Sequence, residues 1–377
     1  MAGPVQARRL TVIQLLPALQ AGGVERSTLE IGYALVLAGH RSIVVSAGGR
    51  LAGRLEAEGS EHVVLDIGRK SLATLRHVWT LRRLFRRERP DIVHARSRLP
   101  AWITRLALAG LRAPRPHFVT TVHGLNSPGF YSSILTRGER VICVSNTVRD
   151  HVLRHYRHVD PARLTVIPRG VDPADFPFGW QPGDAWREAF FGDYPQLRGG
   201  LLLTLPGRGT RLKGHADAIE LLAGLRARGL DCRLLLLGAR QGGREDYVAD
   251  IERLARLRGV GAQLAITPPR KDVSEVLAVS ALVLQLSRQP EAFGRTVLEA
   301  LSLCRPVLGY AHGGVGELLA ELYPEGRVAP GDMTRLVERA AELLRVAPPI
   351  APMTRYRLVD MQAATLGLYD AVTVAGA

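Results

Sequence analysis

The stretch LTVIQLLPALQAGGVERSTLEIGYALVLAGHRSIVVS, residues 10–46, decides the fold class. It opens with an apolar run at Leu10–Leu16 and continues with a helical pattern at Val24–Ala38, which Gly39 closes. A second apolar run follows at Ser42–Ser46. Short, unbroken apolar runs separated by a helix are typical of parallel strands in a sheet that is covered on both faces. We therefore predict an α/β fold with a parallel sheet.

Similar apolar runs continue through the first half of the chain and predict strands at Asp91–Ala95, Phe118–Val122, Val141–Val144 and Leu164–Ile167. Residues 172–200, rich in Pro, Gly and aromatic residues, interrupt the pattern and predict a linker with a helix that leads into a second domain. The second series predicts strands at Leu201–Leu205, Cys232–Leu237, Gln263–Ile266, Leu282–Leu286 and Pro306–Gly309. We expect two Rossmann-like parallel-sheet domains, residues 1–172 and 173–355, facing a central cleft. Ligands bind such sheets beyond the carboxyl ends of their strands.

The whole net charge of +15 comes from the first half of the chain, and the second half is neutral. Residues 1–170 hold 26 Lys and Arg against 11 Asp and Glu, whereas residues 171–377 hold 24 against 24. Such asymmetry indicates an anionic partner for the first half: a membrane surface, a phosphorylated substrate or nucleic acid. An arginine-rich genome would explain many arginines, but not acidic residues missing from one half.

Targeting signals and cysteines point to an intracellular protein. No run approaches the ~20 apolar residues of a membrane span, and Met1–Arg9 lacks a signal-peptide pattern. We expect a cytoplasmic chain. Cys143, Cys232 and Cys304 are far apart in apolar runs, which favours buried free thiols over a disulfide or metal site.

Two glycine-containing loops are candidates for binding an anion. Gly22 and Gly23 precede a predicted helix, whose N-terminus favours negative charge, although a plain tight turn explains them equally well. The segment LTLPGRGTRLKGH, Leu203–His215, places Arg208 and Lys213 beyond the end of a strand. The two cations can converge on a diphosphate, or they are two solvated loop residues.

The segment EAFGRTVLE, Glu291–Glu299, carries two glutamates about two helical turns apart. Gly294 between them lets the chain pass close to a ligand. Glu299 lies in an apolar run, where an unpaired carboxylate is costly. A glycine-rich loop, His312–Glu317, follows the next predicted strand and is a second candidate phosphate loop.

Motifs spread over nearly the whole chain resemble glycosyltransferase family 4, retaining enzymes of the GT-B fold. In order they are GGVE (Gly22–Glu25), PDIVHARS (Pro90–Ser97), TVHG (Thr121–Gly124), VSNTVRD (Val144–Asp150), VIPRGVD (Val166–Asp172), PGRGTRLKGH (Pro206–His215), EAFGRTVLEAL (Glu291–Leu301) and GGVGELL (Gly313–Leu319). The loop LSRQPEAFG departs from the family, which usually has a serine nearer a shorter EGFG stretch. The strand before it also lacks the acidic residue that often stands there.

The resemblance implies a donor site for a nucleotide-sugar, which we expect to be a UDP-sugar. Arg208 and Lys213 would bind its diphosphate, and Glu299 would hold its ribose hydroxyls. Glu291 would contact the donor sugar near the reacting carbon. The candidate donor-binding residues are Gly22, Gly23, Arg208, Lys213, Phe293, Gly294 and Glu299.

For the first domain, the resemblance implies that His123 lies beside the donor sugar and that the final helix, 356–377, packs back onto this domain. The family's enzymes typically need no metal, and no DxD motif is present to hold one. Arg and Lys would do the electrostatic work of a metal. We expect no cofactor, and the predicted catalytic residues are His123, Glu291, Arg208 and Lys213.

A basic helix predicted at Ser71–Arg87 has two interpretations. On a helical wheel one face is apolar, and the other carries Trp79 and Leu72 among Arg76, Arg82, Arg83, Arg86 and Arg87. A tryptophan within an arginine face suits contact with membrane headgroups. The alternative is an ordinary amphipathic helix whose Trp79 packs at the edge of the domain.

Three classes of protein compete. A glycosyltransferase acting on a lipid-linked or cell-envelope saccharide, such as lipopolysaccharide core, explains the domains, the motifs and the basic first half. It would lie peripherally on the inner face of the cytoplasmic membrane. A transferase with a soluble small acceptor is the nearest alternative. A dinucleotide-dependent oxidoreductase would need the absent GxGxxG motif, and a nucleic-acid-binding protein would need more aromatic residues among the arginines.

Overall fold

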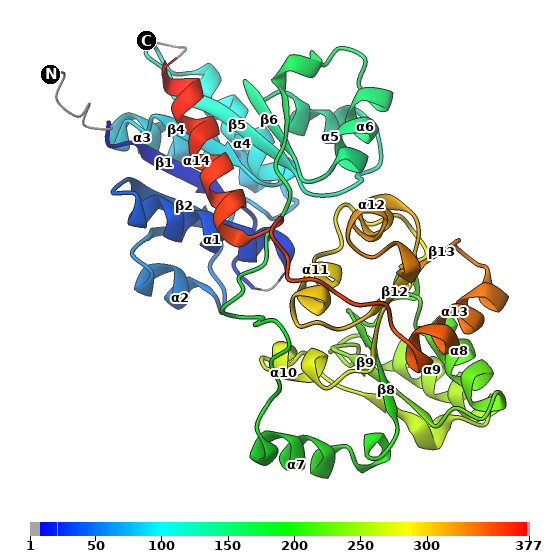
Figure 1. Cartoon of the computed structure of the whole chain (residues 1–377). Helices are drawn as coiled ribbons and strands as arrows, with labels where there is room; N and C mark the ends of the chain where they lie inside the picture. The colour runs from blue at the N-terminus through cyan, green and yellow to red at the C-terminus, as the bar shows by residue number, and fades with distance from the viewer. Residues whose placement is uncertain (1–7, 21, 375–377) are drawn as a thin grey trace, which may run out of the picture. The chain divides into compact units, whose positions relative to one another are not determined.

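The apolar runs of the sequence form the strands of two parallel sheets, each in its own unit (Figure 1). The computed structural model describes residues 8–20 and 22–374. The N-terminal unit comprises the described parts of residues 1–169 and 358–377, and the C-terminal unit comprises residues 170–357. The boundaries predicted after residues 172 and 355 lie close to these.

Seven strands form the sheet described for the N-terminal unit, in the order β3-β2-β1-β4-β5-β6-β7. They are β1 (Thr11–Leu15), β2 (Arg41–Ser46), β3 (Glu61–Val64), β4 (Ile92–Ala95), β5 (His117–Val122), β6 (Arg140–Cys143) and β7 (Leu164–Val166). Strand β1 pairs in parallel with both β2 and β4, so the strand order reverses beside β1. In such sheets the ligand-binding crevice lies at that reversal.

Helices cover both faces of this sheet, because right-handed crossovers run in opposite directions from β1. The helices described in this unit are α1 (Gly23–Leu37), α2 (Ala52–Ala57), α3 (His77–Glu88), α4 (Arg98–Ala109), α5 (Phe130–Ser133), α6 (Asn146–His155) and α14 (Leu358–Val374). Short 3-10 turns include η1 (Leu72–Arg76), directly before α3. Helices α3 and α4 pack side by side, and so do α1 and α14.

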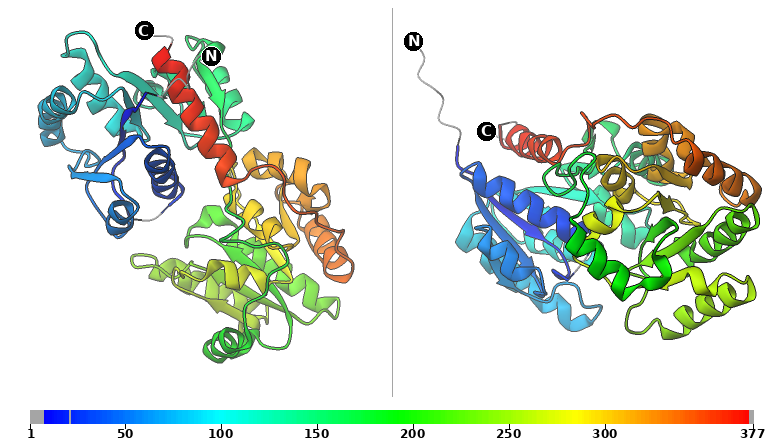
Figure 2. Two further views of the ribbon diagram at one scale, coloured as in Figure 1. Left: turned by 60° about the vertical axis from the view of Figure 1, so that its left-hand side comes forward. Right: turned by 60° about the horizontal axis from the view of Figure 1, so that its bottom comes forward.

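Helix α14 completes the core of the N-terminal unit although it comes from the end of the chain (Figures 1 and 2). Its Leu368, Tyr369 and Val372 pack with residues of α1, β4 and β5. The Tyr369 hydroxyl lies 2.6 Å from Nδ1 of the buried His94, whose Nε2 lies 2.7 Å from the Thr121 hydroxyl. Burial holds the pKa of His94 well below its usual value, so the ring is neutral at physiological pH.

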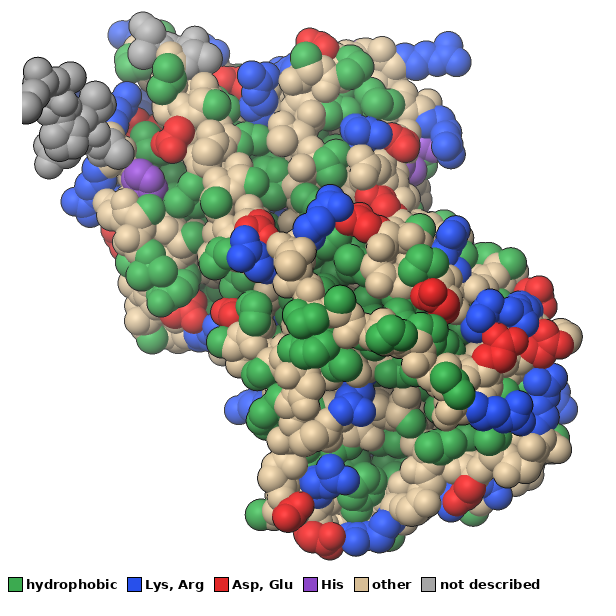
Figure 3. All heavy atoms as spheres, in the orientation of Figure 1, with side chains coloured by type: hydrophobic (Ala, Val, Ile, Leu, Met, Phe, Trp, Pro, Cys, Tyr) green, Lys and Arg blue, Asp and Glu red, His purple; other side chains and the backbone are tan. Residues whose placement is uncertain are grey.

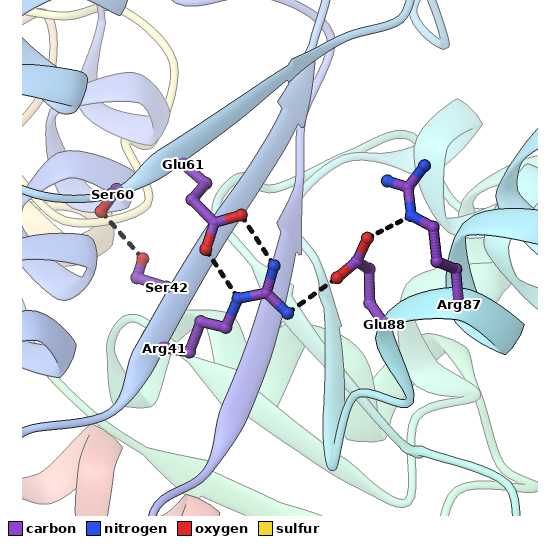
Figure 4. Close-up of polar contacts among 6 residues, drawn as sticks. All are labelled: Arg41, Ser42, Ser60, Glu61, Arg87 and Glu88. Carbon is purple, nitrogen blue, oxygen red and sulfur yellow. Dashed lines mark hydrogen bonds and ion pairs between the residues drawn. The ribbon is translucent and has the colours of Figure 1, made fainter.

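An ion-pair chain fixes the end of α3 to the edge of the sheet (Figure 4). Arg41 on β2 donates two hydrogen bonds to Glu61 on β3, 2.6 and 2.8 Å long, and a third of 2.7 Å to Glu88. Glu88 also accepts from Arg87, and the two arginines lower the pKa of its carboxyl. Arg87 therefore already has a carboxylate partner.

The arginines of α3 lie on its polar face as predicted, and two of them cap helix α4. Arg82 donates to the carbonyls of Ala107 and Leu106, both at 3.3 Å, and Arg86 donates to that of Gly110 at 3.4 Å. Cations at the carboxyl end of a helix complement its dipole and satisfy its last carbonyls. Arg82 and Arg86 thus bind protein carbonyls, whereas Arg76 and Arg83 are exposed without such bonds among the described residues.

In the C-terminal unit, the described parallel strands run in the order β10-β9-β8-β11-β12-β13. They are β8 (Leu201–Pro206), β9 (Cys232–Leu237), β10 (Leu264–Ile266), β11 (Leu282–Gln285), β12 (Val307–Tyr310) and β13 (Arg327–Val328). The helices described in this unit are α7 (Asp184–Asp193), α8 (His215–Ala227), α9 (Glu245–Leu257), α10 (Val273–Ala278), α11 (Arg295–Ser302), α12 (Gly313–Leu322) and α13 (Met333–Arg345). On the visible face of this unit, acidic and basic side chains lie close together mainly toward its outer edge, among hydrophobic and other side chains (Figure 3).

Candidate active site

The loop from Gly207 to Gly214 joins β8 to α8 and carries both predicted diphosphate-binding cations. The Gly207 N–H donates to the Leu237 carbonyl at 2.9 Å, which directs the loop away from the sheet. Lys213 ends the 3-10 turn η5 (Arg211–Lys213), directly before α8. Arg208 is exposed, and its side chain makes no ion pair with any residue that the structure describes. Its guanidinium is available for a ligand.

Lys213 pairs with the predicted catalytic carboxylate. Its Nζ lies 2.6 Å from Oε1 of Glu291, and both side chains are partly exposed, by 29% and 23%. The Ser287 hydroxyl donates to the same carboxylate oxygen, and Nε2 of His312 lies 2.8 Å from the Ser287 carbonyl. The structure thus brings Lys213 and Glu291 together, within reach of solvent.

Glycines at the start of α12 let the Glu291 loop approach this helix closely. A Cβ on Gly313 would lie 2.6 Å from the Glu291 carbonyl oxygen, and one on Gly314 would lie 2.4 Å from Cα of Phe293. The Gly314 N–H donates to the Glu291 carbonyl at 2.7 Å. In the predicted phosphate loop at His312–Glu317, this N–H therefore binds protein backbone. The glycines of the loop let the backbone of Glu291 lie directly against the start of α12.

Glu299 and Phe293 lie on either side of Gly294, which begins α11 in a left-handed conformation at φ 100°. Glu299 is buried, at 7% exposure, on α11, and Phe293 is buried at 8%. The Phe293 ring lies 6.4 Å from that of Tyr356. A Cβ on Gly294 would meet Val315 of α12 at 2.7 Å, so only glycine fits this turn.

Arg288, next to Ser287, belongs to a second cluster that the sequence did not predict. It pairs with Asp217 in the first turn of α8, and Asp217 also accepts from the Tyr310 hydroxyl at 2.8 Å. This ion pair raises the pKa of Arg288. The Arg288 N–H donates to the Leu212 carbonyl at 2.8 Å, which connects the Lys213 loop to the Glu291 loop.

In the N-terminal unit, His123 follows β5 and is oriented by Arg169. Nη2 of Arg169 lies 2.9 Å from Nδ1 of His123, and Arg169 is itself buried, at 7% exposure. A guanidinium has only donors, so Nδ1 accepts and Nε2 carries the proton of the neutral ring. Arg169 belongs to the VIPRGVD motif, and its contact with the histidine was not predicted.

Gly22 and Gly23 are exposed at the start of α1, after β1. Gly22 has φ 141°, and a Cβ there would lie 2.6 Å from Oε2 of Glu25. The negative charge of Glu25 thus stands at the N-terminus of α1, where the sequence predicted a ligand anion.

Four further features of the described structure concern the cysteines, metal ligands, membrane-spanning helices and a cavity. Cys143, Cys232 and Cys304 are free thiols as predicted; the first two are buried and Cys304 is half-buried. No group of three or more His, Cys, Asp or Glu residues suited to a metal occurs in the described chain. None of the described helices has the length and apolar character needed to cross a bilayer. A cavity of about 580 Å³ beside β10 is lined by none of the predicted site residues.

Two family models match successive parts of the chain. The Glycosyltransferase Family 4 model matches residues 21–175, and the Glycosyl transferases group 1 model matches residues 193–352. These matches include every motif of the donor site and the His123 segment.

Two curated relatives are 28% identical to the chain. One is an alpha-maltose-1-phosphate synthase of Mycolicibacterium smegmatis, matched over 62% of this chain and 63% of its own length. The other is a D-inositol 3-phosphate glycosyltransferase of Stackebrandtia nassauensis, matched over 54% of this chain and 46% of its own length. The chain thus spans less than two thirds of each relative.

Solved glycosyltransferase structures share the whole fold. A glycosyltransferase from Rickettsia africae superposes with a TM-score of 0.80 and 25% identity, over 97% of this chain and 98% of its own. Anabaena HepE, solved with UDP-glucose, has a TM-score of 0.78 at 19% identity over 96% and 100% of the two chains. WaaG, described as involved in lipopolysaccharide biosynthesis, has a TM-score of 0.67 at 18% identity over 96% and 98%. The two family-model matches show that the chain belongs to glycosyltransferase family 4, and the likenesses to solved structures show that it has the GT-B fold.

Proposed function

We propose that this glycosyltransferase moves a sugar from a UDP-sugar to a lipid-linked or other cell-envelope saccharide, retaining the anomeric configuration and using no metal. The contact between Lys213 and Glu291 carries the proposal, because it puts a cation for the diphosphate beside a carboxylate for the sugar. The UDP-glucose complex of Anabaena HepE supports UDP as the nucleotide.

Arg208 and Lys213 bind the donor diphosphate and neutralise the charge that grows on it as the glycosidic bond breaks. Lys213 lies next to the carboxylate of Glu291, which holds the donor sugar near its reacting carbon. Glu299 accepts hydrogen bonds from the ribose hydroxyls. His123, whose Nε2 carries the proton because Nδ1 accepts from Arg169, donates to a hydroxyl of the donor sugar.

The N-terminal unit provides the contact with a membrane-bound acceptor. Around η1 and the start of α3, Leu72 and Trp79 are 87% and 61% exposed, and Lys70, Arg76 and Arg83 are exposed beside them. An apolar and cationic surface of this kind suits anionic headgroups. WaaG supports a lipopolysaccharide-type acceptor. We place the enzyme on the cytoplasmic face of the membrane; a soluble saccharide acceptor is the alternative.

A thermal-shift measurement tests the donor site. UDP is expected to raise the unfolding temperature, because a ligand that binds only the folded state stabilises it by mass action. NAD serves as the control. It also carries a diphosphate, but it is the cofactor that the competing class, a dinucleotide-dependent oxidoreductase, would bind. Stabilisation by NAD and not by UDP would contradict the proposal.

Transfer is expected to proceed without a divalent metal, because Arg208 and Lys213 supply the charge that a metal would give the diphosphate. Product formation should be equal in EDTA and in magnesium or manganese. Loss of product in EDTA with rescue by either metal would show that the cations alone do not neutralise the diphosphate.

Vesicle binding is expected to need anionic lipid and to weaken as salt rises. Each Lys or Arg near an anionic surface contributes about 1 kcal/mol, and the attraction is screened within a Debye length of about 10 Å at 0.1 M salt. Replacing Lys70, Arg76 and Arg83 with glutamine should therefore lower sedimentation with anionic vesicles strongly. Arg82 and Arg86 are left unchanged because they cap α4.

The matched control replaces three exposed arginines of the same unit, Arg137, Arg154 and Arg157, with glutamine. This control removes the same charge from other segments and should keep most of the binding. Equal loss in both triple variants would mean that net charge, and not the surface around α3, attracts the vesicles. No binding by the unmodified protein would favour a soluble acceptor.

A further inference from the structure

His215 is a fully buried histidine at the start of α8, and the donor site described above leaves it without a function. Its Nδ1 lies 3.0 Å from the hydroxyl of Tyr247, which comes from the first turn of α9. Its Nε2 is buried and makes no hydrogen bond of ordinary length and angle within residues 8–20 and 22–374, but the ring has a weaker contact of this kind with the Thr210 backbone. A buried polar atom that is poorly paired costs up to about 1–3 kcal/mol relative to an apolar side chain. The imidazole therefore calls for a functional explanation.

The ring is neutral at physiological pH. Burial is the main cause that lowers the pKa of His215 to about 4, and the charge of Lys213 acts in the same direction. A hydrogen-bonding contact with the Thr210 backbone raises the pKa in the opposite direction, so Thr210 lies close to the ring. His215 thus fills the space behind the loop without adding a charge beside Lys213.

Thr210 connects the ring to both diphosphate-binding cations. Its N–H donates to the Arg208 carbonyl at 2.7 Å, and its carbonyl accepts from the Lys213 N–H at 3.0 Å. Tyr247 supports the same loop, since a Cβ on Gly209 would lie 3.6 Å from its Cδ1. His215 and Tyr247, which contact each other, therefore both pack against the loop Gly207–Lys213.

We propose that His215, held by Tyr247, is a positioning residue that fixes the loop Gly207–Lys213 so that Arg208 and Lys213 meet the donor's diphosphate. The inference rests on the proposed function, in which these two cations bind the donor. The ring acts through the loop and touches no substrate. Its effect therefore falls on the diphosphate part of the donor and not on the nucleoside.

Binding of UDP and of uridine, measured by calorimetry or by ligand-observed NMR, separates the two parts of the donor. In His215→Leu, UDP affinity is expected to fall about tenfold or more, the effect of misplacing one charge-assisted hydrogen bond, whereas uridine affinity stays unchanged. His215→Gln should restore part of the UDP affinity, because its amide can donate and accept. Tyr247→Phe should weaken UDP binding less, and adding it to His215→Leu should cause no further loss.

His77→Leu is the matched control, because His77 is a buried histidine of the N-terminal unit whose Nδ1 also lacks a hydrogen bond in the described structure. It should change neither affinity. Equal losses for UDP and uridine in His215→Leu, or no loss of UDP affinity, would overturn the inference. Should His215→Leu not fold, His215→Gln and Tyr247→Phe give the same comparison. An unmodified protein that binds UDP no more tightly than uridine would overturn the proposed donor site itself.

Discussion

Replacing Lys213 with alanine, or Arg208 with alanine, is expected to lower kcat about a hundredfold or more. Each change removes a preorganised cation from the departing diphosphate, a loss of about 2.7–4 kcal/mol of transition-state stabilisation in comparable sites. Lys213→Ala has a second consequence, because it removes the cation 2.6 Å from Glu291. Turnover is to be measured with saturating donor, so that weaker binding does not hide the effect on kcat.

Arg211 provides the control for these two variants. It belongs to the same loop and its side chain is 83% exposed, but it pairs with Asp250 at 3.4 Å and is not a predicted donor ligand. Arg211→Ala should therefore keep turnover near that of the unmodified enzyme. Near-normal turnover in both Arg208→Ala and Lys213→Ala would show that the diphosphate is neutralised elsewhere.

Gly214→Ala is expected to destabilise the C-terminal unit by about 3 kcal/mol or more. Gly214 has φ 77°, and a Cβ there would lie 1.9 Å from the carbonyl oxygen of Leu286. That oxygen belongs to the backbone at the end of β11, so it cannot move aside as a flexible side chain would. The free energy of unfolding, followed by urea denaturation, measures the loss.

The other end of the same helix offers a matched control. Gly229, just after α8, has φ 78°, and a Cβ there would meet no atom within 4 Å. Gly229→Ala should therefore cost only the conformational strain of the left-handed region, about 1 kcal/mol. Equal losses at Gly214 and Gly229 would mean that the close approach to Leu286 does not determine the stability of this loop.

The central strands and the edge strands β7 and β10 were predictable from the sequence, whereas the edge strands β3 and β13 were not. The apolar runs at Leu10–Leu16 and Cys232–Leu237 are strands because both faces of each sheet are covered. The edge strand β3, Glu61–Val64, has mixed polarity and is partly exposed, so its pattern resembles a loop. The two-residue strand β13, Arg327–Val328, is too short to leave a periodic signal.

In the candidate site, the sequence revealed the charged residues but not what holds them. Lys213 and Glu291 are 78 positions apart, and only the packing of two loops brings them together. Arg169 and His123 are likewise distant in the sequence, 46 positions apart, and only tertiary packing brings them into contact. A helical wheel places Arg82 on the polar face of α3, but it contains no information about the neighbouring helix α4, whose carbonyls this arginine binds. Tertiary contacts of this kind leave no local pattern.

The packing of α14 sets the order in which the two units can mature during synthesis. The N-terminal unit needs Leu368, Tyr369 and Val372 for its core and for the contact with His94, and the ribosome makes these residues only after the whole C-terminal unit. The C-terminal unit, residues 170–357, is complete before α14 has been translated. The half of the chain made first is therefore the half that finishes folding last, and a nascent chain stalled before residue 358 exposes the apolar groove that α14 would fill.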